Sequence, residues 1–250
     1  MLTGAAGGFG QAAARRFAAE GARLVLSDMA EVPLMALASA LSEAGAEVLA
    51  EPLDVTDEAQ VAAHVTGGLS RFHRLDVAVN NAGIAPPLVP LTATEAETFD
   101  RVMAINARSV FLGMKHQLPP MLAAGRGAIL NVASAAGLVG AGQMAAYAAS
   151  KHAVVGLTRA AADEVARRGV RVNAICPSFA ATPLYDGIAD ALSGQRAEPR
   201  GNTDARFTRR IPMGRIASPD EVAEAMLWLT DPANSFMTGQ AVAVDGGLSA

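Results

Sequence analysis

The stretch Thr3-Gly4-Ala5-Ala6-Gly7-Gly8-Phe9-Gly10 decides the fold of this chain, together with the two elements that follow it. Residues 11–20 have the pattern of a helix, and the apolar run 23–27 has that of a strand closed by Asp28. Glycines allow a tight turn and a close approach to a phosphate, and a helix N-terminus attracts negative charge. A glycine loop, a helix, a strand and an acidic residue in this order are typical of a unit that binds a dinucleotide.

The same alternation of strands and helices continues along the whole chain. It predicts a doubly wound α/β fold of the Rossmann type, in which helices cover both faces of a parallel sheet. A chain of 250 residues, of which 51% are hydrophobic, can form one such domain, so we predict a single domain over 1–250. The predicted strands are 24–27, 48–53, 77–80, 128–132, 170–175 and 241–244. The predicted helices are about 11–20, 31–44, 57–71, 95–118, 144–168 and 219–230.

Charge and cysteine content exclude several classes of protein. The net charge is −4 and the basic residues are scattered, which indicates no nucleic-acid partner. Cys176 is the only cysteine, so an intramolecular disulfide and a cysteine metal cluster are excluded, and we predict no metal site. No secretory signal is visible, and glycines and polar residues break the uncharged stretch 128–150. We therefore expect a soluble, cytoplasmic protein without a membrane span.

Tyr147 and Lys151 lie four residues apart in a predicted helix, and Ser134 ends a strand upstream of them. On spacing alone, such a pair is also common on solvated helix surfaces. At this spacing both side chains leave the same helix face, so the ammonium can stabilise a phenolate and lower the phenol pKa from its usual value near ~10. The pair indicates acid/base chemistry, and the hydroxyl of Ser134 can hydrogen-bond a substrate oxygen.

Further motifs extend from the glycine loop almost to the end of the chain. They are Thr3-Gly4-x-x-x-Gly8-x-Gly10, Asp54-Val55, Asn80-Asn81-Ala82-Gly83, Asn106, Ser134, Tyr147-x-x-x-Lys151, Pro177 to Thr182, and Thr238-Gly239-Gln240-x-x-x-Val244-Asp245-Gly246-Gly247. In this order and at these spacings, the chain resembles the short-chain dehydrogenase/reductases. The resemblance implies an oxidoreductase that transfers a hydride between a nicotinamide dinucleotide and a secondary alcohol or ketone.

The resemblance also implies a role for each site residue. Tyr147 is then the proton donor and acceptor, Lys151 its electrostatic partner and a ribose ligand, and Ser134 the anchor of the substrate oxygen. Asn106 holds a water that relays protons through the lysine; a tolerated, buried asparagine is the alternative. The implied dinucleotide contacts are Gly4, Gly8, Phe9, Gly10, Asp28, Asp54, Val55, Asn80, Ala82, Gly83, Tyr147, Lys151, Pro177, Ala180 and Thr182.

Asp28 determines which dinucleotide we expect. A carboxylate at this position accepts hydrogen bonds from both ribose hydroxyls and repels a 2′-phosphate, so it favours NAD over NADP. Capping the helix that begins near Glu31 is the alternative role of this side chain. Thr3 and Asn81 have structural alternatives too, because each can tie neighbouring backbone segments together without touching the cofactor.

Three features depart from the family or extend it. The family has a full strand before the glycine loop, whereas only Met1, Leu2 and Thr3 precede Gly4 here, so we expect the natural product to start further upstream, with a shortened strand as the alternative. Ser178 follows Pro177 where the family usually has glycine, which alters how the nicotinamide end is held. The segment 184–211, rich in polar residues, glycine and proline, predicts a mobile lid over the substrate, with a flexible surface loop as the alternative.

The sequence therefore favours an NAD-dependent enzyme that oxidises a secondary alcohol, with similarity to family members that act on cyclic diols or small secondary alcohols. A 3-oxoacyl-carrier-protein reductase is the nearest alternative, and its usual preference for NADP argues against it. A dinucleotide-binding protein without turnover is a second alternative. By resemblance, the chain forms a homotetramer through helices 95–118 and 144–168 and the C-terminal segment.

Overall fold

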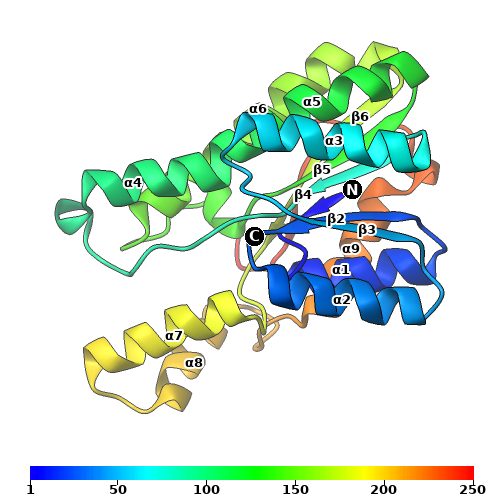
Figure 1. The fold of residues 1–250 in the computed structure, drawn as a ribbon. Helices are drawn as coiled ribbons and strands as arrows, with labels where there is room; N and C mark the ends of the chain where they lie inside the picture. The colour runs from blue at the N-terminus through cyan, green and yellow to red at the C-terminus, as the bar shows by residue number, and fades with distance from the viewer.

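Seven parallel strands form one sheet in the computed structural model, which describes residues 1–250 (Figure 1). Their order across the sheet is β3-β2-β1-β4-β5-β6-β7, so the chain reverses its direction of winding between β1 and β4. The strands are Leu2–Thr3 (β1), Leu24–Asp28 (β2), Val48–Pro52 (β3), Val77–Asn80 (β4), Gly127–Val132 (β5), Val170–Pro177 (β6) and Ala241–Val244 (β7). The predicted doubly wound α/β fold and all six predicted strands are confirmed.

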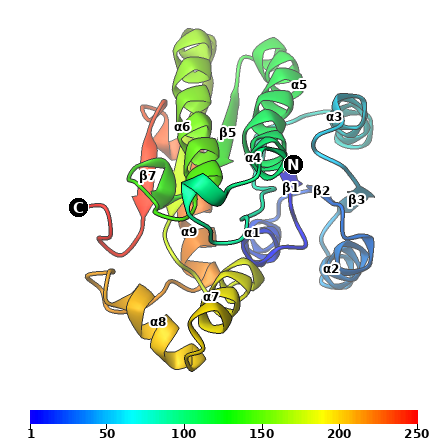
Figure 2. The same ribbon diagram turned by 90° about the vertical axis from the view of Figure 1, so that its left-hand side faces the viewer.

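Helices cover both faces of this sheet (Figures 1 and 2). One layer contains α1, α2 and α9, and the opposite layer contains α3, α5 and α6 (Figure 1). The helices are Gly8–Ala19 (α1), Glu31–Glu43 (α2), Glu58–Phe72 (α3), Ala96–Met103 (α4), Ser109–Ala124 (α5), Ala145–Val165 (α6), Pro183–Arg196 (α7), Arg200–Thr208 (α8) and Pro219–Thr230 (α9).

Apolar side chains fill the space between the sheet and each helical layer. Leu26, Leu130 and Ile175 are fully buried strand residues in the cluster that also contains residues of α1, α2 and α9. A second cluster, around Ile129 and Val172, contains residues of α5 and α6. The central strands are buried along nearly their whole length, as expected when a parallel sheet is covered on both sides.

The helix predicted over 95–118 is both longer and more irregular than expected. A π-helical turn, Ala104–Arg108, separates α4 from α5, and it contains the buried Asn106. Pro119 and Pro120 do not end α5, although each lacks a backbone N–H. The fully buried Met121 anchors this end of α5, which stops at Gly125 with a left-handed φ of 65°.

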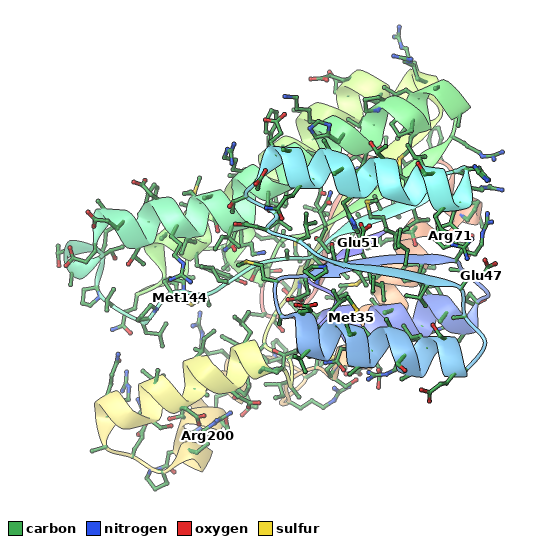
Figure 3. All side chains as sticks on the ribbon, in the orientation of Figure 1. Met35, Glu47, Glu51, Arg71, Met144 and Arg200 are labelled. Atoms are coloured by element: carbon green, nitrogen blue, oxygen red, sulfur yellow. The ribbon has the colours of Figure 1, made fainter.

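The segment predicted as a lid contains two helices, α7 and α8, which form a hairpin apart from the sheet (Figures 1 and 2). Arg200 begins α8, and its guanidinium pairs with carboxylates of both helices (Figure 3). The rings of Tyr185 and Phe207 pack against each other with centroids 5.6 Å apart. These contacts make the hairpin one ordered unit rather than a loop without structure.

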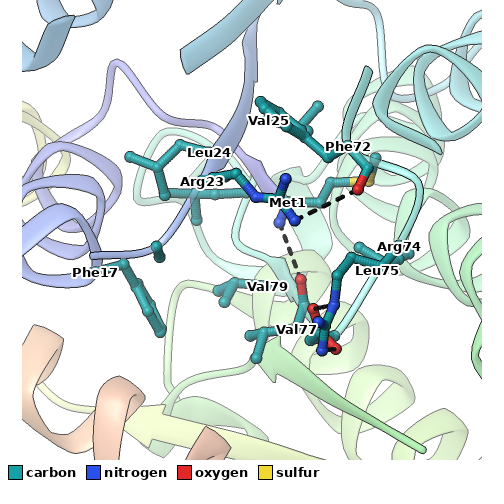
Figure 4. Close-up of a pocket in the computed structure, with 13 residues that line it drawn as sticks. Met1, Phe17, Arg23, Leu24, Val25, Phe72, Arg74, Leu75, Val77 and Val79 are labelled. Atoms are coloured by element: carbon teal, nitrogen blue, oxygen red, sulfur yellow. Dashed lines mark hydrogen bonds and ion pairs between the residues drawn. The ribbon is translucent and has the colours of Figure 1, made fainter. Parts of the chain in front are cut away.

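A cavity of about 160 Å³ lies beside the short strand β1 (Figure 4). Leu2 pairs with Leu26 on one side and Val79 on the other, so the earlier residues of β2 and β4 face the cavity without β1 between them. The amino group of Met1 donates a hydrogen bond of 2.9 Å to the Val77 carbonyl at its edge (Figure 4). The central strand β1 is therefore shorter than the strands on either side of it.

No helix of this structure combines the length and the apolar character needed to cross a membrane.

Candidate active site

A cleft of about 310 Å³ runs along the carboxyl ends of the central strands. It lies where the order of the strands reverses, between β1 and β4, which is where ligands bind in open α/β sheets. The residues predicted from the sequence that line it are Gly4, Gly8, Phe9, Asp28, Asp54, Val55, Ala82, Gly83, Tyr147, Lys151 and Thr182. Residues distant in the chain thus meet in one cleft.

The glycine loop can take its shape only with glycine at two positions. Gly4 has a φ of 65°, a left-handed conformation in which a side chain is strained. A Cβ on Gly10 would lie 2.1 Å from the Gly4 carbonyl oxygen, so Gly10 allows helix α1 to begin against the loop. Gly8, the first residue of α1, lines the cleft. The N-terminus of α1, with its unpaired N–H groups, is thus available to an anionic group in the cleft.

Thr3 and Asn81 hold the loop after β1 against the loop after β4. The Thr3 hydroxyl accepts hydrogen bonds from the backbone N–H groups of Asn81 and Ala82, at 3.1 and 3.2 Å. The Asn81 side chain donates to the carbonyls of Thr3 and Gly4 at 3.0 and 2.9 Å. The structure shows the tying role that the sequence left open for both residues.

The carboxylates of Asp28 and Asp54 enter the cleft from the ends of β2 and β3. Asp28 accepts one hydrogen bond from the N–H of Ala6 in the glycine loop and another from that of Ala30. Asp54 accepts from the backbone and the hydroxyl of Thr56, each at 2.8 Å. Both carboxylates are therefore held in place by their own chain and remain open to the cleft.

Asn80 and Gly10 do not line the cleft, although the sequence suggested contacts for both. The buried side chain of Asn80 exchanges hydrogen bonds with Gln117 and donates to Asn131 at 2.9 Å. This cluster of amide side chains lies between the sheet and α5, because the Asn80 side chain points to the face that α5 covers. Gly10 is buried against the backbone of Gly4 and Ala5. For these two residues, the structure shows a positioning role for the loops that do reach the cleft.

Tyr147 and Lys151 both enter the cleft from the first turns of α6. The Lys151 ammonium lies 5.6 Å from the centre of the Tyr147 ring and donates a hydrogen bond of 2.9 Å to the Val132 carbonyl. Its side chain is only 4% exposed, and this burial lowers the pKa of Lys151 to about 8. The surroundings thus favour loss of the lysine proton.

The phenol of Tyr147 behaves differently from the expectation. Burial raises the pKa of Tyr147, and a hydrogen bond with Ser134 offsets only part of this rise. We expected the ammonium of Lys151 to lower the tyrosine pKa, but desolvation raises this pKa and only the hydrogen bond with Ser134 opposes the rise. The free protein therefore holds a protonated phenol at neutral pH, beside the Ser134 hydroxyl.

Asn106 lies in the π-helical turn and is completely buried. Its side-chain oxygen accepts from the N–H of Ile84 at 2.8 Å, while its amide donates to the Ile84 carbonyl and to the Ser150 hydroxyl. The amide thus fixes the loop after β4 against α6. A Cβ on Gly83 would lie 3.2 Å from the Asn106 oxygen and 3.5 Å from the Lys151 nitrogen, so this loop also backs the lysine closely.

A second cavity, of about 120 Å³, adjoins the cleft and shares Tyr147, Phe9 and Thr182 with it. Its other predicted residues are Ser134, Pro177, Ser178 and Ala180. Figure 3 shows Met144, which also lines this cavity, across the opening from the hairpin that carries Arg200. The walls are mainly apolar, and Leu184, Tyr185 and Ile188 of α7 contribute one of them.

Several residues that line the two cavities were not predicted from the sequence. Arg101 and Ile105 line the cleft, and their i, i+4 spacing on one helix face was the available signal. Arg210 and Leu248 line the apolar cavity, and no local pattern marks either of them. They belong to segments far from Tyr147 in the chain, so only the tertiary fold places them at the site.

The arrangement can exchange a proton at the boundary between two cavities of different character. On one side is a long cleft with backbone N–H groups and carboxylates, suited to an extended, partly anionic ligand. On the other is a small apolar cavity, suited to a compact carbon skeleton. Tyr147 lines both, so a reacting atom placed beside its hydroxyl contacts both ligands.

The chain is similar to known proteins over nearly its whole length. A family model described as enoyl-(acyl carrier protein) reductase matches residues 4–249. The chain is 43% identical over 250 residues to the cis-4-hydroxycyclohexanecarboxylate dehydrogenase of Sinomonas cyclohexanicum, covering 100% of this chain and 96% of the relative. The crystal structure of a levodione reductase has a TM-score of 0.94 and 40% identity, covering 99% of this chain and 96% of that one. The 3-ketoacyl-(acyl-carrier-protein) reductase from Brucella melitensis complexed with NADH has a TM-score of 0.89 and 36% identity, covering 100% and 97%.

Proposed function

The chain belongs to the short-chain dehydrogenase/reductase family, and from this premise we propose that it oxidises a cyclic secondary alcohol to the ketone with NAD. The observation that carries the proposal is the position of Tyr147, which lines both the dinucleotide-sized cleft and the apolar cavity. One similar protein supports the cyclic skeleton, since it is a cis-4-hydroxycyclohexanecarboxylate dehydrogenase.

The cleft fits a dinucleotide by its chemistry. Gly8 at the N-terminus of α1 supplies backbone N–H groups for the pyrophosphate, and Asp54 and Val55 flank the place of the adenine. Asp28 is positioned by two backbone N–H groups, and its carboxylate receives the ribose hydroxyls and disfavours a 2′-phosphate. NAD, when bound, accepts the hydride from the alcohol carbon. Ala82, Gly83, Pro177, Ala180 and Thr182 complete the contacts we propose.

Proton transfer is the task of the protein's own residues. Ser134 donates a hydrogen bond to the substrate oxygen. The phenol of Tyr147 first releases its own proton to solvent, and the resulting phenolate takes the hydroxyl proton as the hydride leaves. Lys151, buried beside the ring, contributes its positive charge and passes protons on. Because both N–H donors of the Asn106 side chain are used by Ile84 and Ser150, and its oxygen already accepts from Ile84, we assign the water contact at this turn to the backbone of the π-helix.

We also propose that the α7–α8 hairpin closes over the substrate, because α7 supplies one wall of the apolar cavity. Closure removes water from the place where the hydride moves. Hydrogen exchange measured by mass spectrometry checks this: backbone amides of 183–208 should exchange more slowly when NADH and a ketone are both bound. Equal exchange with and without the ligands would mean that the hairpin is a static wall.

The test of the function is a panel of alcohols with NAD, followed by the absorbance of NADH. We expect turnover with cyclohexanol and cyclohexanediols, and a loss of about 10²- to 10⁴-fold in kcat when Tyr147 is replaced by Phe. NADH should bind the Tyr147→Phe variant as tightly as the wild type, because the phenyl ring keeps its place. Undiminished activity of this variant would exclude the assigned base.

The competing functions give other results in the same assay. A carrier-protein reductase, which the Brucella melitensis relative represents, reduces a 3-ketoacyl thioester faster than it oxidises any alcohol of the panel. A protein without catalytic function binds NADH and turns over nothing.

Kinetics with NADP test the cofactor preference: the wild type should prefer NAD, and Asp28→Ala should lose most of that preference. A wild type that prefers NADP would contradict the role given to Asp28.

A further inference from the structure

The apolar cavity beside Tyr147 contains a single charged residue, Arg210. The other lining residues are apolar, glycine, serine, threonine or tyrosine, and none carries a carboxylate. Arg210 follows the end of α8 and precedes the buried Ile211. The next residues are fixed to the C-terminal segment, since the N–H of Met213 donates to the Gly246 carbonyl at 3.1 Å. The backbone therefore holds this arginine at the cavity.

Arg210 and the adjacent Arg209 have no partner, but only Arg210 lines the cavity. Arg200 pairs with three aspartates, Arg206 with Glu198, and Arg215 with Glu221. The guanidinium of Arg210 makes neither an ion pair nor a side-chain hydrogen bond, although it has five N–H donors. Arg210 is an exposed side chain, so solvent screens its charge, but its N–H donors are free for an anion that enters the cavity.

We infer that the substrate of the proposed dehydrogenase is a compact alicyclic secondary alcohol that bears a carboxylate, and that Arg210 binds this carboxylate. The inference rests on the proposed function, since Tyr147 must act on the alcohol in the same cavity. A planar guanidinium matches a carboxylate with two parallel hydrogen bonds. One arginine neutralises one negative charge, so a carboxylate matches it more closely than a dianionic phosphate does.

The size of the cavity agrees with a ring. Its volume is about 120 Å³. An apolar cavity of about 150 Å³ is known to hold benzene, so one six-membered ring nearly fills this space. Such a ring can present its hydroxyl to Tyr147 and Ser134 while a substituent reaches Arg210. Arg210 is exposed at its outer side, so the carboxylate lies at the mouth of the cavity rather than in its interior.

The experiment compares 4-hydroxycyclohexanecarboxylate with its neutral methyl ester as substrates. The wild type should favour the carboxylate by about 10- to 100-fold in kcat/KM, the range for a hydrogen bond to a charged group. Arg210→Met should remove this preference, mainly through KM, and leave kcat/KM for the ester within about 3-fold. Arg209→Met is the matched control: it is adjacent, exposed and outside the cavity lining, and it should keep the wild-type preference.

A wild type that uses the ester as well as the acid, or an Arg210→Met variant that still prefers the acid, overturns the inference. Calorimetric titration with cyclohexanecarboxylate, which has no hydroxyl to oxidise, separates this result from a failure of the proposed function. If no alcohol is oxidised but this ligand binds the wild type and Arg209→Met, and not Arg210→Met, the arginine site stands without the dehydrogenase. If cyclohexanecarboxylate binds no better than its carboxamide, the arginine site is refuted.

Discussion

Burial controls the protonation of the residues at the centre of the site. It raises the pKa of Tyr147 and lowers that of Lys151 to about 8, so each group favours its neutral form. At neutral pH the phenol is uncharged and its burial costs little. The lysine is charged at this pH, so its burial destabilises the folded protein. The buried ammonium of Lys151 therefore lowers the unfolding free energy of the protein.

This instability gives a pH-dependent prediction for Lys151→Met. The pKa of the lysine falls from 10.5 to about 8 on folding, so its cost is fully present below pH ~8 and disappears as the pH rises toward ~10.5. Relative to the wild type, the variant should be most stable near neutral pH. Its advantage in unfolding free energy should fall by about 2 kcal/mol between pH ~7 and pH ~9.5, from the conversion of about 1.36 kcal/mol per pKa unit.

Urea unfolding of both proteins at the two pH values measures this change. The hydrogen bond from Lys151 to the Val132 carbonyl is lost in the variant at every pH, so it shifts the whole curve without altering the slope. A stability difference independent of pH would mean that the lysine is not desolvated in the folded protein. The variant should also lack activity, which shows that the destabilising group is retained for function.

At the scale of the elements, the glycine loop packs so closely against the first turn of α1 that no side chain fits at Gly10. A Cβ on Gly10 would lie 2.1 Å from the Gly4 oxygen and 2.7 Å from the Cα of Ala5, both of them backbone atoms. Alanine is favoured over glycine within a helix by about 1 kcal/mol, but this gain is smaller than the cost of moving the loop. We predict that Gly10→Ala destabilises the protein by about 1–3 kcal/mol and weakens NADH binding.

Gly7→Ala is the matched control in the same loop. There the nearest atom to an added Cβ is the Gly4 oxygen at 3.4 Å, an ordinary contact, and φ is −73°, which any residue can adopt. Its unfolding free energy should lie within about 1 kcal/mol of the wild-type value. Similar losses in both variants would show that the loop is generally intolerant, rather than closed at Gly10.

The sequence predicted most elements because their patterns are local. Strands such as Leu24–Asp28 are continuous apolar runs between turn residues, and the fold follows from their alternation with helices. The α7–α8 hairpin was missed as helical, because its stability comes from the aspartates around Arg200 and from aromatic contacts rather than from an apolar stripe. The helix predicted to end at about residue 118 continues through Pro119 and Pro120 to Ala124, because the buried Met121 packs at this end.

The site residues likewise fall into those that local patterns predict and those that only the tertiary fold places. Residues that immediately follow strands, such as Asp28 and Asp54, were predicted because the carboxyl ends of parallel strands converge. Asn80 also ends a strand, but its side chain points toward α5 rather than into the cleft. The motif alone does not give that direction. Arg210 reaches the site only through the tertiary path of the chain after α8, for which the sequence has no marker.

At the scale of the whole molecule, large apolar side chains remain exposed on the helical layers. Phe111 on α5 is 47% exposed, and Phe99 on α4 is 41% exposed. An aromatic ring on the outer face of a helix is stabilised when a second copy covers it. Together with the resemblance to the family, this supports our proposal of a tetramer in which α4, α5, α6 and the C-terminal segment pack against another subunit.

We predict that Phe111→Glu breaks this association. The substitution places a charge where the partner helix would bury it, and an unpaired charge at a buried contact is strongly unfavourable. Sedimentation velocity should show a tetramer for the wild type and smaller species for the variant. Val32→Glu is the control, because Val32 is 82% exposed on α2, in the helical layer on the other face of the sheet (Figure 1). If both variants remain tetrameric, or the wild type is a monomer, α5 is not the interface.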